Sequence, residues 1–472
     1  MNAEPRNPAL EARIVENPDD DATYSVYGDW LETRGHPRGA LITAQAAGNA
    51  EVEAAILAEH RELLGPPLDL DPQPTITWHL GFWRRLQVGY WGWSPKPAED
   101  RDVATLLAHP SARFVRELTV AGSLTPAVFQ ILATAHATVT LLDVRVGDGV
   151  DDRCLEALAS CTRLEQLHLF SCDDVTARGA QVLRAMRALR SLDLRNCPLD
   201  DRIADCLADL PHFERVMFNA VSREFSARGM AALARAPLVS LELGGEHVGD
   251  AHVAELAHHA TLANLEIGRA PLSTAGAASL ATLPDLRRLY VCSSSLGDAG
   301  VHELASLPLR SLHLGHCKTL TDAACASIAR IATLRFLDLS SNAIGSAGLR
   351  ALHPLGELEQ LVLAFLGVDD AAVADICASF PKLRALSLGF SREITDAAID
   401  ALVRLDALES LDLAGSQVTA RGIDRLAQMP NLTALGLEDC SRDAIERAKA
   451  NERWYVNTRD LLDHYDSLAD YA

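Results

Sequence analysis

The chain has 472 residues, of which 48% are apolar, 23% charged and 5% aromatic, which is the composition of a globular protein. Its formal net charge of −21 argues against a nucleic-acid or anionic-membrane partner, because phosphate groups bind basic surfaces. No apolar run reaches the roughly 18 residues of a membrane span, and residues 1–21 lack the apolar core of a signal peptide.

Residues 1–48 are predicted to form a small helical domain. An Asp-capped helix follows Asp19–Asp21, the sequence Gly-His-Pro at residues 35–37 interrupts it, and a second helix begins there. Three consecutive carboxylates could in principle bind a cation. A solvated helix N-terminus explains them better, because the helix dipole favours negative charge at that end.

Residues 49–112 are predicted to contain a helix over residues 51–64 and then an aromatic-rich cap. Four of the six tryptophans lie between Trp78 and Trp93. They could form an aromatic binding patch, with stacking by Arg84 and Arg85. The preferred interpretation is a cap, because the first unit of a repeat array needs bulky apolar cover on its open core.

From residue 113 to residue 440 the sequence repeats itself. The pattern LxxLxL, with leucine in all three places, begins at Leu164, Leu189, Leu238, Leu309, Leu334, Leu358, Leu383, Leu408 and Leu432. Looser copies, with another apolar residue in one or more places, begin at Val115, Val139, Phe213, Leu262 and Leu286. The fourteen copies recur about every 24 residues, a regularity that chance does not produce.

Two periodicities predict the structure of each copy. The LxL alternation indicates a short strand with one buried face. The residues between strands place their apolar side chains at helical spacing, and several of these stretches open with a capping residue such as Thr176, Thr395 or Thr419. One strand and one helix cannot bury their apolar faces alone, so the copies are expected to stack into a parallel sheet covered by helices.

This pattern resembles the leucine-rich repeat. The segment from Leu334 to Leu349 is similar to the ribonuclease-inhibitor-like and cysteine-containing subclasses in its helix entry, Gly-x-Ala-Gly-Leu, and in its period. Those subclasses prefer Asn or Cys at the ninth position, and five copies have one there: Cys172, Cys197, Cys317, Asn342 and Cys440. Other copies depart from this preference. The resemblance implies an α/β solenoid of about 14 repeats, with a concave parallel sheet, convex helices and terminal caps.

The N-terminal segment also shows a resemblance. Its residues Pro18-Asp-Asp, Asp29-Trp-Leu-Glu32 and Gly35 are similar to a short repeat-companion domain that precedes leucine-rich arrays in some bacterial proteins. Tyr27-Gly28 departs from the small apolar pair expected there. The resemblance implies a bacterial source and no particular biochemical role.

The C-terminal residues 441–472 are predicted to form a cap followed by an amphipathic helix. A last helix is expected over residues 442–450 and a closing strand over residues 454–456. Beyond them the apolar residues Leu461, Leu462, Tyr465, Leu468 and Ala469 fall on one helical face, opposite a row of aspartates. This helix either packs on the solenoid, which is the preferred interpretation, or docks on another protein.

No catalytic or metal-binding pattern is found. The sequence contains no GxxxxGK[ST], GxSxG or HExxH motif, so neither an enzyme nor a cofactor is expected. His313, His316 and Cys317 have suggestive spacing, but the repeat register directs His313 out of the sheet and Cys317 into the core, so they do not converge on a metal. The ten cysteines form no CxxC pair, which favours free buried thiols and a cytoplasmic location.

The side of the sheet opposite the helices carries a row of acidic residues. The fifth position of the copies holds, in order, Thr119, Asp143, His168, Asp193, Met217, Glu242, Glu266, Tyr290, His313, Asp338, Val362, Ser387, Asp412 and Gly436. Six of these fourteen are acidic and none is Lys or Arg. The seventh position is small in most later copies, which leaves room for a partner. The predicted protein-binding residues are Asp143, His168, Phe170, Asp193, Met217, Glu242, Glu266, Arg288, Tyr290, His313, Asp338 and Asp412.

Two functions are compatible with this pattern, beside a purely structural interpretation of the charges. The leading hypothesis is a non-catalytic scaffold that binds a protein partner, of basic character, on the acidic concave face. The alternative is a regulator of a partner enzyme, either an inhibitor or a GTPase activator with Arg145 or Arg195 at the partner's phosphate site. The simplest interpretation is that acidic residues and a row of arginines at the second position compensate each other in the sheet. No nucleic acid or membrane is expected as a partner, and the oligomeric state stays open.

Overall fold

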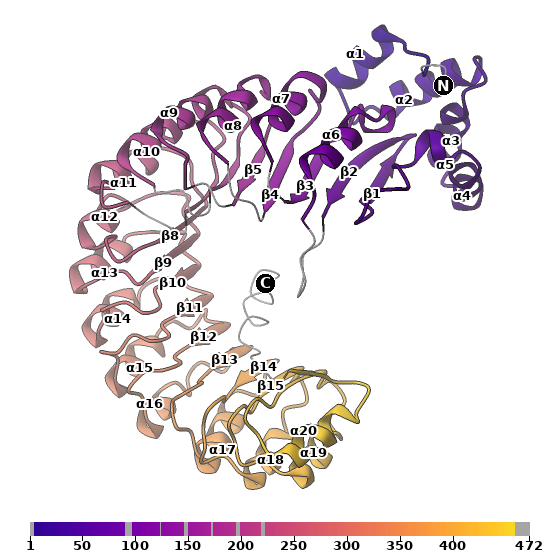
Figure 1. The fold of residues 1–472 in the computed structure, drawn as a ribbon. Helices are drawn as coiled ribbons and strands as arrows, with labels where there is room; N and C mark the ends of the chain where they lie inside the picture. The colour runs from indigo at the N-terminus through magenta and orange to yellow at the C-terminus, as the bar shows by residue number, and fades with distance from the viewer. Residues whose placement is uncertain are drawn as a thin grey trace. The chain divides into compact units, whose positions relative to one another are not determined.

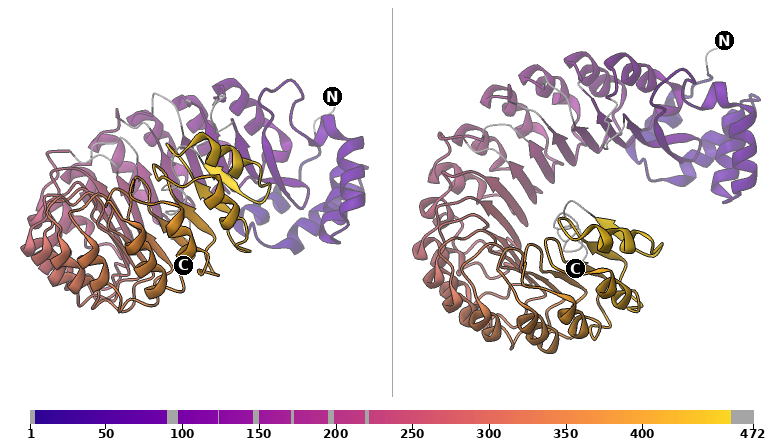
Figure 2. Two further views of the ribbon diagram at one scale, coloured as in Figure 1. Left: turned by 90° about the horizontal axis from the view of Figure 1, so that it is seen from below. Right: turned by 60° about the horizontal axis from the view of Figure 1, so that its bottom comes forward.

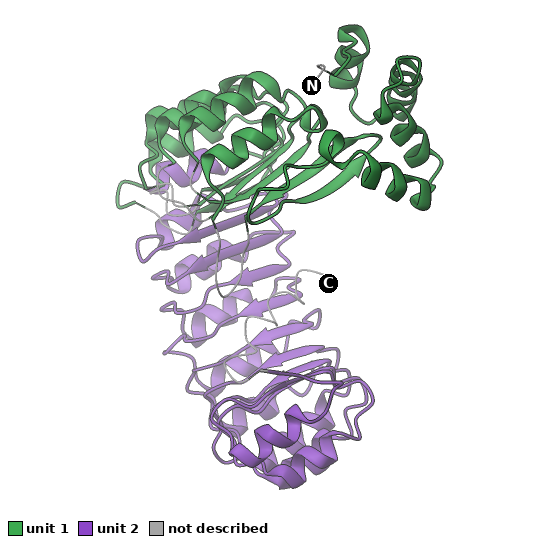
Figure 3. Cartoon of the chain, turned by 45° about the vertical axis from the view of Figure 1, so that its right-hand side comes forward, with its two compact units in different colours: residues 1–225, 235–238 green, residues 226–234, 239–472 purple. Residues whose placement is uncertain are grey.

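The structure, a computed structural model, describes residues 4–89, 97–122, 124–145, 150–170, 173–194, 199–218 and 222–457. The chain divides into two compact units, called unit 1 (residues 1–225 and 235–238) and unit 2 (residues 226–234 and 239–472; Figure 3). Among the helices of the described ranges, none combines the length and the apolar character that a membrane crossing requires.

Unit 1 begins with five helices. They are α1 (Pro8–Glu16), α2 (Asp21–Glu32), α3 (Pro37–Ala46), α4 (Ala50–Glu59) and α5 (Arg61–Leu64). The helices expected from the Asp19–Asp21 cap, the Gly-His-Pro break and residues 51–64 are present, whereas α1 was not expected from the sequence. Asp20 is the N-cap residue of α2, and Asp19 forms ion pairs with Arg84 (2.7 Å) and Arg116 (3.0 Å). Asp19 therefore ties the start of α2 to the strands that follow.

A hydrophobic cluster joins these helices to the strands. Its members come from α1, α2, α3, the first hairpin and the start of the first repeat: Ile14, Tyr24, Tyr27, Leu31, Ile42, Leu80, Phe82 and Phe114. Inside the same region the fully buried Arg38 binds Glu4 through two hydrogen bonds (2.7 and 3.1 Å) and the Ser111 hydroxyl (3.0 Å). The buried guanidinium is paired with Glu4, and its contact with Ser111 links α3 to the segment just before the first repeat.

The aromatic segment forms the first strands of unit 1. Strands β1 (Thr75–His79) and β2 (Phe82–Val88) make an antiparallel hairpin, and β2 pairs in parallel with the first repeat strand. Phe82 and Trp83 are buried, and the Trp83 ring stacks on His109 at 4.7 Å between centroids. This is the cover that the cap interpretation requires. Trp91 and Trp93 lie outside the described residues. Helix α6 (Asp100–Ala108) and a 3₁₀ turn, η1 (Pro110–Ala112), lead into the repeats.

Fourteen described strands, β3 to β16, correspond one to one with the fourteen sequence copies. Unit 1 holds β3 (Glu117–Ala121), β4 (Leu141–Arg145), β5 (Gln166–Leu169), β6 (Ser191–Leu194) and β7 (Arg215–Phe218). Unit 2 holds β8 (Ser240–Gly244), β9 (Asn264–Gly268), β10 (Arg288–Tyr290), β11 (Ser311–His313), β12 (Phe336–Asp338), β13 (Gln360–Val362), β14 (Ala385–Ser387), β15 (Ser410–Asp412) and β16 (Ala434–Gly436). The expected α/β leucine-rich repeat solenoid is thereby confirmed.

A helix or 3₁₀ turn follows each strand from β3 to β15 and covers the same face of the sheet within each unit (Figures 1 and 2). In unit 1 these are α7 (Pro126–Ala135), α8 (Asp152–Ala157), η2 (Leu158–Ser160), α9 (Ala177–Ala180), η3 (Gln181–Ala185) and α10 (Asp201–Leu207). In unit 2 they are α11 (Ala227–Leu233), α12 (Asp250–Ala254), α13 (Thr274–Leu280), α14 (Asp298–Leu304), α15 (Asp322–Ile328), α16 (Ser346–Ala351), α17 (Asp370–Ser379), α18 (Asp396–Leu402) and α19 (Ala420–Leu426).

The fourth-position leucines form the core of the repeats. Within unit 2, Leu312 pairs in register with Leu289 and Leu337, and each of them is fully buried. Alternation along a strand then directs the third and fifth positions to the opposite face of the sheet, which is called the inner face below. The leucines thus decide which side chains a partner can meet.

Hydrogen bonds between successive helices repeat along the array. An aspartate at or near the start of one helix accepts bonds from the backbone N–H of the N-cap residue of the next. In five repeats it also binds the Thr or Ser hydroxyl at that cap. The acceptors are Asp100, Asp152, Asp250, Asp298, Asp322, Asp370 and Asp396. Asp396, for example, accepts from Thr419 N (2.9 Å) and Oγ1 (2.5 Å). Thr419 Oγ1 in turn accepts from Arg421 N at 3.3 Å, so one hydroxyl both caps its own helix and holds the preceding one.

A glycine three residues after the N-cap makes room for this aspartate. At Gly422 an added Cβ atom would overlap the Asp396 carboxylate, and Gly179, Gly276 and Gly348 meet the same obstacle. In these four repeats the glycine leaves room for the carboxylate of the previous repeat. Ala324 and Ala398 take the same position beside Asp298 and Asp370, so the contact also forms where a methyl group is present.

The C-terminal end of unit 2 closes with a helix and a strand. Helix α20 (Arg442–Lys449) is followed by β17 (Tyr455–Asn457), which pairs with β16. The buried Trp454 donates its indole N–H to the Leu432 carbonyl at 2.9 Å. The amphipathic helix expected from Leu461 onwards lies outside the described residues.

We expect Asp396→Ala to lower the free energy of unfolding by about 1–2 kcal/mol, because the N-cap N–H and hydroxyl of Thr419 lose their acceptor. Chemical denaturation followed by circular dichroism measures the change. Asp400→Ala is the matched control: it lies in the same helix and its ion pair with Arg425 is exposed, so a loss below about 1 kcal/mol is expected.

A double-mutant cycle tests the role of the glycine. Gly422→Ala should cost less stability in the Asp396→Ala background than alone, because the carboxylate that the methyl group meets is gone. Additive effects of the two substitutions would contradict this explanation.

Candidate functional site

The predicted inner-face row is aligned within each unit. In unit 1 strand pairing places Asp143 beside His168, His168 beside Asp193, and Asp193 beside Met217. In unit 2 it aligns Glu242, Glu266, Tyr290, His313, Asp338, Val362, Ser387, Asp412 and Gly436. Each row runs at one side-chain position per strand, about 4.8 Å apart.

The unit 1 row is organised around Arg145. Its Nε donates to both carboxylate oxygens of Asp143, at 2.8 and 2.7 Å, and its guanidinium carbon lies 5.6 Å from the centre of the Phe170 ring. Arg145 was not among the predicted binding residues, although its position two residues after Asp143 on one strand face could have identified it. His168 Nε2 lies 3.3 Å from the Ser191 hydroxyl. Asp193 is buried and Met217 is half-buried.

The unit 2 row begins with two neighbouring glutamates. Glu242 in β8 and Glu266 in β9 are directly opposite each other in the parallel register, and both are half-buried. This part of the row therefore presents two carboxylates side by side on neighbouring strands. Tyr290 continues the row on β10, and Arg288 lies two residues earlier on the same face.

An aromatic row follows these glutamates. The Tyr290 and His313 rings have centroids 5.3 Å apart, and His313 stacks on Phe336 at 4.2 Å with an interplanar angle of 22°. His313 is 2% exposed, and its Nε2 lies 2.9 Å from the Ser311 hydroxyl. Burial, together with the nearby Arg288 guanidinium, lowers the pKa of His313 to about 3, so the ring is neutral at physiological pH. Phe336 occupies a third position, like the predicted Arg288, but was not among the predicted binding residues.

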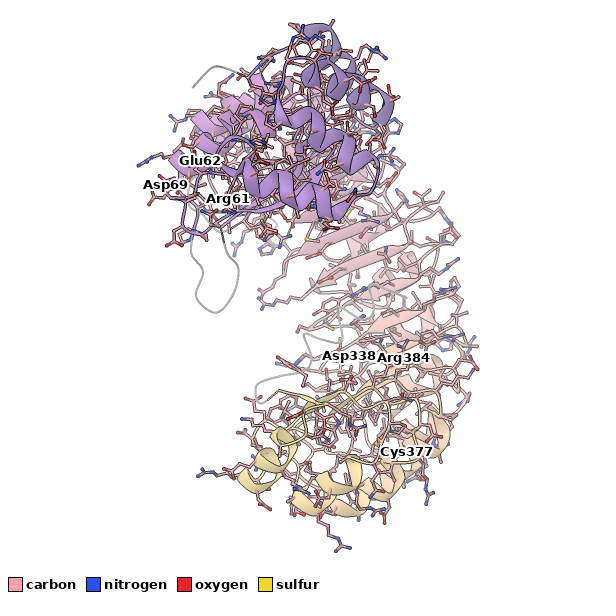
Figure 4. The ribbon with its side chains drawn as sticks, turned by 90° about the vertical axis from the view of Figure 1, so that its right-hand side faces the viewer. Arg61, Glu62, Asp69, Asp338, Cys377 and Arg384 are labelled. Atoms are coloured by element: carbon pink, nitrogen blue, oxygen red, sulfur yellow. The ribbon has the colours of Figure 1, made fainter. Side chains whose placement is uncertain are left out.

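The two aspartates later in the row fill the space that the small seventh-position residues provide. Asp338 accepts from Ser340 N at 2.8 Å (Figure 4 labels Asp338), and Asp412 accepts from the Ser387 hydroxyl at 2.8 Å. A Cβ atom at Gly315 would lie 2.7 Å from an Asp338 oxygen, and one at Gly389 would lie 2.6 Å from an Asp412 oxygen. The sequence interpretation assigned this space to a partner. At Gly315 and Gly389 the structure corrects it, because the chain's own carboxylates take up that space.

Metal ligands do not gather among the described residues. Among them no group of three or more His, Cys, Asp and Glu side chains could hold a metal ion. Cys317 is buried, with its Sγ 3.3 Å from the Val291 carbonyl, whereas His316 is exposed. Burial raises the pKa of Cys154 and Cys161 to about 11, so these thiols are protonated and poor nucleophiles at neutral pH.

Family models match two short parts of this array. Both models are described as leucine-rich repeats, and they match residues 331–352 and 188–210. This chain is built of leucine-rich repeats. The subclass and the N-terminal companion domain suggested by the sequence stay predictions. No curated protein matches the chain.

Several solved structures with leucine-rich repeats are similar at low identity. A chain of the Rad7–Elc1 complex of yeast is 17% identical with a TM-score of 0.47, covering 75% of this chain and 82% of its own. An internalin of Listeria monocytogenes is 17% identical with a TM-score of 0.36, covering 79% and 85%. A leucine-rich repeat protein of Leptospira interrogans is 16% identical with a TM-score of 0.42, covering 77% and 93%. Scores this low leave the function open.

We expect the buried His313 to make stability depend on pH. The pKa of about 3 in the folded chain lies below the ordinary value near 6.5, so the unfolded chain binds more protons between these values. Stability should therefore fall as the pH drops from about 6.5 towards 3, with a contribution of at most about 1.4 kcal/mol per pH unit from this residue.

His313→Phe keeps an aromatic ring between Tyr290 and Phe336 and removes the titrating group. Chemical denaturation at pH 7 and at pH 5 measures how much the free energy of unfolding falls between the two. This fall should be about 2 kcal/mol smaller for the variant than for the wild type. The exposed His353→Phe is the control and should follow the wild type. Equal pH dependence of wild type and His313→Phe would contradict the expectation.

Proposed function

We propose that this protein is a non-catalytic scaffold whose unit 2 inner face binds a basic segment of a partner protein. The observation that carries the proposal is the pair Glu242 and Glu266, two half-buried carboxylates in register on neighbouring strands. A lysine or arginine of the partner would meet both carboxylates in a partly desolvated place, where Coulomb interactions are stronger than in water.

The rest of the row supports the same partner. The seven predicted residues of unit 2 include four carboxylates and one guanidinium, because His313 is neutral. Tyr290 lies next to Glu266 and provides an aromatic surface for the apolar part of a long cationic side chain. Complementary charge of this kind raises the association rate and selects against acidic partners.

The buried members of the row act differently from the half-buried ones. Asp412 is 3% exposed and accepts hydrogen bonds from the Ser387 hydroxyl and from Ala414 N. Its charge therefore acts on a partner without direct contact. Glu242 and Glu266 are accessible enough for direct contact. The expected contact therefore lies near β8 to β10, with Asp338 and Asp412 extending the negative field along the row.

The described thiols support the cytoplasmic location as part of this proposal. Eight free cysteines are found in the described ranges, and burial raises the pKa of both Cys325 and Cys377 to about 12. Protonated thiols of this kind persist in a reducing compartment.

Regulation of a partner enzyme, such as GTPase activation, is the second function that the sequence suggested, and no described contact favours it. An activating arginine has to reach a phosphate group. The Arg145 guanidinium is bound to Asp143, which competes with any phosphate. Arg195 lies outside the described residues.

Charge reversal tests the scaffold function. The triple variant Glu242→Lys, Glu266→Lys and Asp338→Lys should weaken the binding of a fluorescent peptide carrying four lysines by about a hundredfold or more. Fluorescence anisotropy at two salt concentrations measures the affinity, which should fall with salt in the wild type.

A matched variant controls for net charge. Glu255→Lys, Glu303→Lys and Asp400→Lys change the charge equally on the helix side of unit 2 and should leave the affinity within about threefold. Equal losses in the two triple variants, or no loss in the first, would remove the inner face as the binding site.

A further inference from the structure

Two phenylalanines form a stacked pair beyond the carboxyl ends of β13 and β14. The rings of Phe365 and Phe390 have centroids 4.3 Å apart and an interplanar angle of 9°. Phe365 is 50% exposed, one of the few large apolar side chains of the described residues that are this accessible. Exposed aromatic rings of this kind are more typical of binding surfaces than of structural support.

The backbone at both residues is left-handed, with φ of 61° at Phe365 and 59° at Phe390. The eighth position of neighbouring repeats has the same conformation, and it is occupied there by His316, Ser341, Gly415 and Asp439. A residue with a bulky side chain is disfavoured in this region, whereas glycine adopts it freely. The conformation of the turn therefore does not explain why phenylalanine occupies this position in two successive repeats. This points to a role for the two rings.

The eighth positions continue the ladder of the sheet. Ser341 N donates to the Ala364 carbonyl and Phe365 N donates to the Gly389 carbonyl, each at 2.9 Å. Ser341, Phe365 and Phe390 therefore follow one another at about the spacing of the strands. The Phe390 ring stacks on one face of the Phe365 ring, and half of the Phe365 side chain stays accessible.

The stack is closed at its other end. A Cβ atom at Gly415 would lie 3.3 Å from Cδ1 of Phe390, so the Phe390 ring packs closely over the Gly415 backbone. Phe390 is half-buried, so Phe365 is the more accessible ring of the pair.

A carboxylate lies on the same repeat as Ser341. Asp338 ends β12, three residues before Ser341, and its Oδ1 accepts from Ser340 N at 2.8 Å. Its Oδ2 lies on the side of Gly315, so Asp338 would act on a cation at Phe365 through its charge and not by direct contact. A nucleic-acid base could stack on the same ring, but its phosphates would be repelled by the acidic row.

We propose that the open face of Phe365 receives the guanidinium of an arginine from the partner protein. This proposal rests on the proposed function and specifies it, because it distinguishes arginine from lysine. Guanidinium is planar and weakly hydrated and stacks on aromatic rings, whereas the compact ammonium of lysine keeps its water and gains less.

The test compares two peptides of identical length and sequence that carry either four arginines or four lysines. The full-length wild type should bind the arginine peptide about three to ten times more tightly. Phe365→Ser, which copies the neighbouring Ser341, should remove this preference and leave the affinity for the lysine peptide unchanged. Phe390→Ser should reduce the preference, because the Phe365 ring loses its support.

Leu68→Ser is the matched control, since Leu68 is an exposed apolar residue of unit 1 (60% exposed) and should leave the preference intact. Thermal unfolding of Phe365→Ser checks that the variant is folded. Equal affinities of the wild type for the two peptides, or a preference that survives in Phe365→Ser, would overturn this inference and leave the scaffold function standing.

Two further outcomes separate the proposals. Absence of binding by either peptide would overturn the scaffold function together with the inference. Tighter binding of a single-stranded RNA oligonucleotide than of either peptide, lost in Phe365→Ser, would assign the ring to a nucleobase and overturn the choice of arginine.

Discussion

The contact that orders this molecule is the one between neighbouring repeats: a leucine pairs in register with the leucine of the next strand, and an aspartate holds the cap of the next helix. The leucines supply the apolar area that no single strand and helix can bury. The aspartate gives this burial a fixed geometry, because Asp396 accepts from Thr419 only when the two helices begin at the same level. Gly422 is small for the same reason. Register on the helix side therefore fixes register on the inner face.

The repeats could be predicted because their information is local. The strand of each copy follows from LxL, and caps such as Thr395 precede their helices in the sequence. The N-terminal part could not be predicted as well, since its stability depends on distant pairs. Glu4 and Arg38 lie 34 residues apart, and Arg38 binds Ser111 a further 73 residues along the chain. Helix α1 and the β1–β2 hairpin depend on such long-range contacts, and no short sequence pattern predicts them.

The candidate site shows the same division between local and tertiary information. Which residues share the inner face follows from the two-residue period of a strand, so the rows containing Glu242 and Asp338 were predicted in the right order. How accessible each one is depends on its neighbours. His313 is buried because Tyr290 and Phe336 stand on either side, and the space beside Gly389 is filled by Asp412. Phe365 was overlooked because the sequence alone does not show that the eighth position has a left-handed backbone, for which phenylalanine is an unusual choice.

These details give the two parts of the proposed interface different tasks. Charge acts over several ångströms and tolerates burial, so Asp412 can steer a basic partner although it is covered. Aromatic stacking acts only at contact, so it requires an exposed ring, and Phe365 is half exposed where the row's own His313 is not. A surface that only steered would bind any polycation equally. A surface that also provides a ring for stacking discriminates between cations of the same charge. Its specificity is then a difference between two affinities and does not depend on total charge.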